Sequence, residues 1–350
     1  MGLSNELTFE ECLRDIGLED EALRLAIRRP SCLSMRFAHS VTGWEYGRVQ
    51  AWGENPAVAA KVKETSPSEY CDLTQRHLEP LLVRFALIVD PAEPDLGNCS
   101  GKAGDLGRAL ARDTLHTMGS IKPAGVKACN VLLRADLNKY MNKERVAALH
   151  WVANPGFSTF PGLIGHLRAV RPCDEWVMVA FGPGGSNPFE GLELSDPKLV
   201  ACVREMVGDD SLPVEIIAMD PWTVRESVAT EYSKASSDAY LLGDAAHRHP
   251  PAVGLGSNTC IQDAYNLAWK VAFVSKGVAG PSLLQTYSQE RQPVGAALVR
   301  ESNTQLNPNN ALWSVLGLNA SSAETDQQEV SELGRQRMLD VFGGRICTKF

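Results

Sequence analysis

The 350-residue chain lacks the features that mark membrane, nucleic-acid-binding and secreted proteins. No apolar run approaches the ~20 residues that a membrane helix needs, so no membrane span is expected. The net charge is −8 and no cluster of Lys or Arg stands out, which argues against a nucleic-acid partner. Met1 leads into a polar helix start at residues 8–11 rather than into a signal peptide. The nine cysteines are odd in number and have no regular spacing, which favours a globular protein of the reducing cytoplasm.

Motifs for hydrolysis and metal binding are missing as well. Neither Ser186 nor Ser257 lies in a GxSxG turn, so nothing supports a serine hydrolase. His247 and His249 are two residues apart, but no third ligand has a matching spacing, so no metal site is expected. A GxGxxG turn, which would hold the pyrophosphate of a dinucleotide, occurs nowhere in the sequence.

The most informative stretch of the sequence is residues 239–258. Residues 239–243 predict a short apolar strand that ends at Asp244, and prolines and a Gly-rich turn then lead into a helix near 259–276. Ligands of open α/β sheets bind at the carboxyl ends of strands, and small turn residues let backbone amides approach a flat group at a helix N-terminus. Ser257 or Asn258 can cap that helix, and one apolar face of it is expected to pack under the sheet. We interpret this stretch as a cradle for the riboflavin half of FAD, with Asp244 on a ribityl hydroxyl.

The same residues carry a family resemblance. GDAAHRHPP at 243–251, GLGSN at 254–258 and IQDAYNLAWK at 261–270 closely resemble the second flavin-binding motif of FAD-dependent aromatic hydroxylases, in the phenol 2-monooxygenase and 2,4-dichlorophenol 6-monooxygenase branch. The resemblance implies FAD as cofactor, NAD(P)H as transient reductant, O2 and a small aromatic substrate as partners, and it allows a homodimer. It assigns no catalytic residue. The cofactor contacts that it implies are Gly243, Asp244, Pro251, Gly254, Leu255, Gly256, Asn258, Gln75 and Asp105.

The sequence also departs from that family. Relatives begin with a GxGxxG unit and continue into a thioredoxin-like domain, and Leu106 follows Asp105 where relatives carry glycine. We therefore expect weaker binding of FAD than in complete relatives. Three hypotheses stay open: an aromatic hydroxylase, a truncated non-catalytic relative that acts as a binding protein or is a partial gene product, and a flavin oxidase or epoxidase on the same scaffold.

Periodicity and turn signals predict an α/β fold with α+β elements that contains an antiparallel sheet. The resemblance implies that this fold is a partial FAD-binding Rossmann-like domain with an interleaved antiparallel-sheet substrate domain. The FAD-binding part is assigned to 1–34, 71–118 and 226–305, the substrate-binding sheet to 35–70 and 119–225, and a helical or irregular tail to 306–350. Helices are predicted near 8–28, 75–86, 196–207, 259–276 and 282–302, with Pro293 as a kink or break, and strands near 43–50, 127–133, 147–153, 166–171, 175–182, 214–220 and 239–243.

Overall fold

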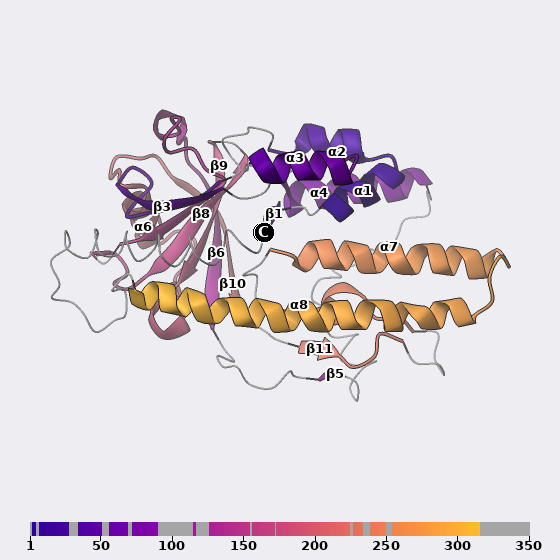
Figure 1. Cartoon of the computed structure of the whole chain (residues 1–350). Coiled ribbons are helices and arrows are strands. Elements are labelled where there is room, and N and C mark those ends of the chain that lie inside the picture. The colour runs from indigo at the N-terminus through magenta and orange to yellow at the C-terminus, as the bar shows by residue number, and fades with distance from the viewer. Residues whose placement is uncertain are drawn as a thin grey trace.

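A computed structural model describes residues 2–4, 7–27, 34–50, 56–68, 72–89, 115–116, 126–154, 156–171, 173–224, 227–233, 239–249 and 254–315 (Figure 1). The helices are α1 (Leu7–Asp15), α2 (Glu19–Leu25), α3 (Pro56–Thr65), α4 (Gln75–Val89), α6 (Pro197–Val207), α7 (Gly256–Ser275) and α8 (Ser282–Val315), with 3-10 turns η2 (Asn138–Tyr140), η3 (Pro183–Gly185) and η4 (Gly243–Ala245). The strands are β1 (Gly2–Ser4), β2 (Ser34–Ala38), β3 (Glu45–Gln50), β4 (Asp72–Thr74), β5 (Leu115–His116), β6 (Lys127–Arg134), β7 (Leu149–Ala153), β8 (Ile164–Arg171), β9 (Glu175–Phe181), β10 (Glu215–Thr223), β11 (Ser227–Ala229) and β12 (His247–Arg248). None of the helices in these ranges combines the length and the apolar composition that crossing a bilayer demands.

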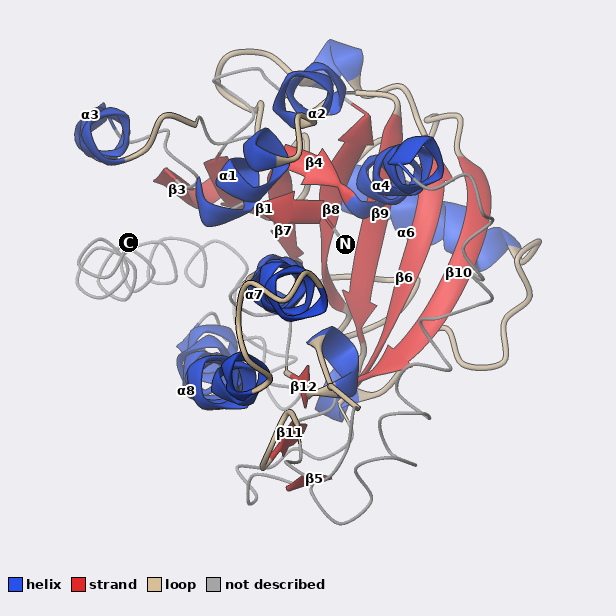
Figure 2. Ribbon diagram, turned by 90° about the vertical axis from the view of Figure 1, so that its right-hand side faces the viewer, coloured by secondary structure: helices blue, strands red, loops and turns tan. Residues whose placement is uncertain are grey.

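A seven-stranded sheet in the order β10-β6-β9-β8-β7-β2-β3 is the largest unit. Its neighbours are antiparallel except β2 and β7, which run parallel. Alternate residues of each strand point to opposite faces, so Leu167 and Ala169 of β8 reach the core that α6 covers, while His166 and Arg168 lie on the other face. Figure 2 shows α6 behind the sheet and α1, α4 and β4 in front of it. We call the side of the sheet that faces α1, α4 and β4, opposite α6, the inner face.

Helix α6 forms where the sequence predicts it, because both of its ends carry the expected signals. Asp196 accepts a hydrogen bond from the Lys198 N–H at 2.9 Å, and Gly208 ends the helix in the left-handed region with φ 84°. The residues of its buried face are Leu199, Cys202, Val203, Met206 and Val207. They pack on the sheet and close the largest core.

Helices α7 and α8 lie side by side, and the connection between them is at the end farther from the sheet (Figure 1). The N-terminus of α7 therefore points toward the sheet. Two ion pairs connect the segment around β4 to the inner face: Arg168 donates to Asp72 Oδ1 and Arg76 donates to Glu175 Oε1, each at 2.6 Å. The sheet and the helices are thus joined by charged contacts as well as by packing.

The mixed α/β class and the mostly antiparallel sheet are confirmed. The strand predicted at 239–243 is wrong: Tyr240 makes only an isolated bridge with Ser233, and η4 begins at Gly243. The reason is that no strand in the described ranges lies beside this segment to continue a ladder. The domain boundaries stay a prediction, although α8 runs across the proposed boundary at 305–306.

Three helix predictions also need correction. The single helix at 8–28 is two helices, because the chain turns at Gly17 with φ 76°. Pro293 does not break α8, which continues through it. Helix α7 begins before the predicted caps, at Gly256, and its apolar face does not pack under the sheet as expected: Ile261 and Leu267 pack against smaller core clusters, whereas Val271 is 44% exposed. The buried residues of α7 are instead polar, namely Asn258, Thr259, Asp263 and Lys270.

Candidate functional site

The turn η4 carries Asp244 and is shaped by the glycine before it. Gly243 has φ +57°, and a Cβ at this position would lie 3.2 Å from Cys260 Sγ on α7. A side chain there would be strained by the backbone and would press on α7. Asp244 itself is exposed, and its Oδ1 lies 4.0 Å from Cys260 Sγ. The carboxylate that the sequence singles out is therefore accessible and close to the first turns of α7.

A buried carboxylate on α7, which the sequence interpretation missed, holds this turn in place. Asp263 is 0% exposed, and its Oδ2 accepts hydrogen bonds from the Gly243 N–H at 3.2 Å and from His247 Nε2 at 3.0 Å. Its Oδ1 accepts a hydrogen bond from Arg291 Nε of α8 at 2.7 Å. One side chain thus joins η4, β12, α7 and α8.

The segment before η4 is fixed by hydrogen bonds rather than by a strand ladder. Leu241 donates its N–H to the Tyr232 carbonyl at 2.7 Å, and its own carbonyl accepts from the Tyr287 hydroxyl at 2.8 Å. The ring of Tyr232 stacks on His247, which in turn stacks on His249. These three rings form a row of aromatic and imidazole groups that includes His247, three residues after Asp244.

At the start of α7, glycine is again required by a close contact. A Cβ on Gly256 would lie 3.0 Å from His249 Nε2, and Gly254 has φ +70°. Leu255 precedes the helix, and its side chain has no acceptor that could cap the first N–H groups. Those N–H groups and the positive end of the helix dipole suit a ligand with electronegative edges.

The other predicted contacts are less directly placed. Asn258 is fully buried, and Gln75 is exposed at the start of α4, where its amide donates to Glu79 Oε1. Pro251 and Asp105 lie outside the described residues. The structure brings Gly243, Asp244 and Gly256 around one helix end, and the cofactor roles of all nine residues remain predictions.

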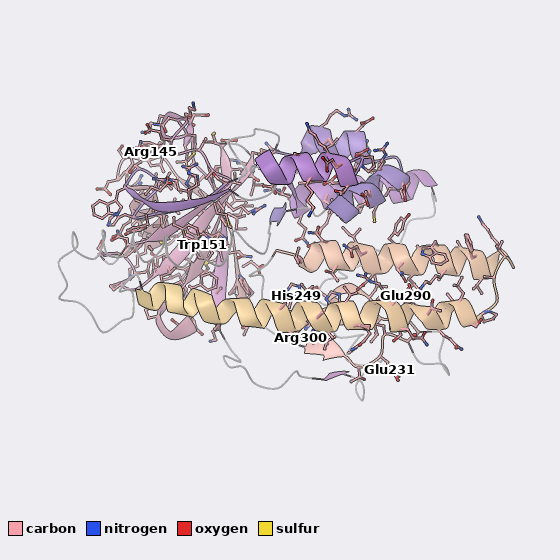
Figure 3. The ribbon with its side chains drawn as sticks, in the orientation of Figure 1. Arg145, Trp151, Glu231, His249, Glu290 and Arg300 are labelled. Atoms are coloured by element: carbon pink, nitrogen blue, oxygen red, sulfur yellow. The ribbon has the colours of Figure 1, made fainter. Side chains whose placement is uncertain are left out.

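The inner face of the sheet carries aromatic and polar side chains opposite this helix end. The register of the strands aligns one row across it, made of Asp220, Asn130, Val179, His166, Trp151 and Phe37. Figure 3 marks Trp151 in the sheet, and His249 and Glu290 along the α7–α8 pair. The row therefore offers ring surfaces and hydrogen-bonding groups at the same level of the sheet.

Two contacts orient the polar members of this row. Trp222 Nε1 donates to Asn130 Oδ1 at 2.8 Å, and Phe181 meets the Trp222 ring edge-on. The ring of His166 lies 4.6 Å from that of Trp151, and burial together with the charge of Arg168 lowers the pKa of His166 to about 3. His166 is therefore neutral near pH 7 and can serve as a hydrogen-bonding group but not as a cation.

Residues 99–302, more than half of the chain, match the family described as "FAD binding domain". The chain belongs to the FAD-binding domain family. Among curated proteins, the chain is 35% identical over 367 residues to a 2,4-dichlorophenol 6-monooxygenase of Cupriavidus pinatubonensis. The aligned region covers 96% of this chain and 59% of the relative. The chain is 32% identical over 359 residues to a phenol 2-monooxygenase of a Pseudomonas species, covering 98% of this chain and 58% of the relative. The chain thus spans about 60% of the length of these relatives.

Solved structures show the same fold. The flavin-dependent monooxygenase PieE, determined with FAD and substrate, has a TM-score of 0.77 at 25% identity, with 98% of this chain and 64% of that one covered. The aklavinone-11 hydroxylase, determined with FAD and aklavinone, has a TM-score of 0.64 at 23% identity, with 86% and 60% covered. The family resemblance inferred from residues 243–270 is therefore confirmed.

Proposed function

We propose that the protein is an FAD-dependent monooxygenase that hydroxylates a phenolic or other aromatic substrate with NAD(P)H and O2. One observation carries the proposal: the N-terminus of α7, with Asp244 close to it, points toward the sheet (Figure 1), whose inner face carries aromatic side chains. The names of the curated relatives support the reaction class.

The residues of the helix end fit the riboflavin half of FAD. Gly243 and Gly256 keep side chains out of two places where the backbone lies against α7 and His249. Asp244 would accept a hydrogen bond from a ribityl hydroxyl, and the first N–H groups of α7 would stabilise negative charge at the pyrimidine edge. When bound, the flavin supplies the redox chemistry with O2, and the protein contributes binding, orientation and electrostatics.

The substrate would lie against the inner face of the sheet. Phe181, Trp222 and Trp151 provide ring surfaces for an aromatic molecule, and Asn130 and His166 provide hydrogen-bonding groups for its oxygen. No residue is assigned as the base that removes the phenolic proton. A cytoplasmic location fits the five free thiols of the described residues. We also propose that the protein forms a homodimer.

The test is spectroscopic and then kinetic. The purified 350-residue protein is titrated with riboflavin, FMN and FAD by flavin fluorescence, and NAD(P)H consumption is then followed with phenol and 2,4-dichlorophenol. We expect binding of all three flavins with similar affinity, because all the contacts proposed at the α7 end are to the riboflavin half and the sequence carries no GxGxxG turn for the ADP half. Failure to bind any flavin would contradict the proposal and favour the non-catalytic binding protein. FAD binding far tighter than riboflavin binding would reveal an ADP site elsewhere in the chain.

A further inference from the structure

We propose that Asp263 is a positioning residue that fixes the Gly243–Asp244 turn against α7 and so sets the place of the Asp244 carboxylate in the flavin site. Its effect on flavin binding rests on the proposed function. The positioning role itself stands on three hydrogen bonds to a single buried carboxylate.

The three partners of Asp263 come from two parts of the chain, the segment around η4 and helix α8. Gly243 lies 20 residues before it, His247 lies 16 before it and Arg291 lies 28 after it. A carboxylate has two acceptor oxygens and no donor, so it can accept from all three donors at once. An apolar residue at this position would leave the Gly243 N–H and the Arg291 charge without this partner in a buried place.

The Gly243 hydrogen bond links Asp263 directly to the site. The Gly243 N–H belongs to the residue before Asp244, and the positive φ of Gly243 sets the direction in which the chain continues. The hydrogen bond from His247 holds the chain on the other side of Asp244, three residues later. Asp263 therefore fixes η4 on both sides of the residue that would contact the ribityl chain.

Lys270 provides a matched control on the same helix. It is also 0% exposed, and its Nζ lies 2.8 Å from both Glu290 Oε2 and Thr286 Oγ1 of α8. Like Asp263, it joins α7 to α8 through a buried charge, but neither of these partners belongs to η4 or β12. Lys270→Met should therefore weaken the helix pair without moving the turn.

The experiment compares Asp263→Asn and Asp263→Ala with Lys270→Met in the full chain. The first readout, made without flavin, is hydrogen exchange of the Gly243 amide and the NMR signals of the His247 ring. We expect faster Gly243 exchange and shifted His247 signals in both Asp263 variants, and neither change in Lys270→Met beyond what its global stability explains. Asp263→Asn keeps the shape of the side chain and remains informative if Asp263→Ala does not fold.

The second readout is flavin binding and the visible spectrum of the bound flavin. We expect Asp263→Asn to weaken riboflavin binding by about tenfold, the factor carried by one hydrogen bond of a charged group, and to alter the flavin band. Equal effects of Asp263→Asn and Lys270→Met on both readouts would overturn the positioning role. Absence of flavin binding in the unaltered protein would count against the proposed function alone, because Gly243 exchange still decides the role of Asp263.

Discussion

Gly295 on α8 offers a sharp test of the packing around the candidate site. A Cβ at this position would lie 2.0 Å from the hydroxyl oxygen of Tyr232 and 3.2 Å from His247 Cδ2. Replacing glycine by alanine inside a helix ordinarily stabilises a protein by up to about 1 kcal/mol, whereas forcing a methyl group into a packed interior costs about 1–3 kcal/mol. Since a contact of 2.0 Å cannot persist, we expect Gly295→Ala to lower the free energy of unfolding by about 1–2 kcal/mol.

The Tyr232 hydroxyl makes the test a double-mutant cycle. That oxygen is buried and has no hydrogen-bond partner among the described residues, so Tyr232→Phe alone should change stability little or raise it. Without the hydroxyl, the nearest atoms to the new Cβ are His247 Cδ2 at 3.2 Å and Tyr232 Cζ at 3.3 Å, and Gly295→Ala should then lose most of its effect. Urea unfolding followed by circular dichroism measures all four proteins, with Gly280→Ala as control because its Cβ would have room. The reasoning is refuted if Gly295→Ala is as stable as the unaltered protein, or if its effect is unchanged in the Tyr232→Phe background.

Two further predictions concern the cofactor and pH. Asp244→Ala should weaken flavin binding by about 1.5–3 kcal/mol with the fold intact, since Asp244 is exposed and its carboxylate would bond a ribityl hydroxyl; unchanged affinity in a fluorescence titration would remove it from the site. Stability should fall as the pH drops from about 6.5 toward 3, because burial and the charges of Arg36 and Arg48 lower the pKa of His150 to about 3, so the unfolded chain binds a proton that the folded chain does not. The slope is about 1.4 kcal/mol per pH unit for this one group, and unfolding curves of His150→Gln should show a smaller slope than the unaltered protein.

Six of the seven strands of the sheet, all but β2, and helix α6 were predictable because their signals are local. Turns near 154–156 and 171–174 separate the strand segments between 127 and 182, and Asp196, Pro197 and Gly208 mark the ends of α6 within a few residues. The motif at 243–258 also placed Asp244 near the start of α7 by proximity in sequence alone. Features with local causes can therefore be inferred from neighbouring residues.

Features that depend on distant partners were not predictable. The apolar run at 239–243 has the composition of a strand, but strand formation needs a neighbour, and Tyr240 finds only the bridge with Ser233. The role of Asp263 depends on Arg291, which lies 28 residues away on another helix. Periodicity on α7 could not show this, because the helix buries polar residues and exposes Trp269 and Phe273.

The buried polar contacts between α7 and α8, made by Asp263 and Lys270, limit how far the two helices can slide along each other. Apolar side chains accept many relative positions, but Asp263 and Lys270 each find their partners on α8 at only one. A shift of one turn, about 5.4 Å, would leave both buried charges without those partners, at a cost of several kcal/mol. The buried contacts of Asp263 and Lys270 therefore fix the axial position of α7 and of its N-terminus relative to the turn that carries Asp244. The apolar residues on the exposed side of α7 can vary without changing that position.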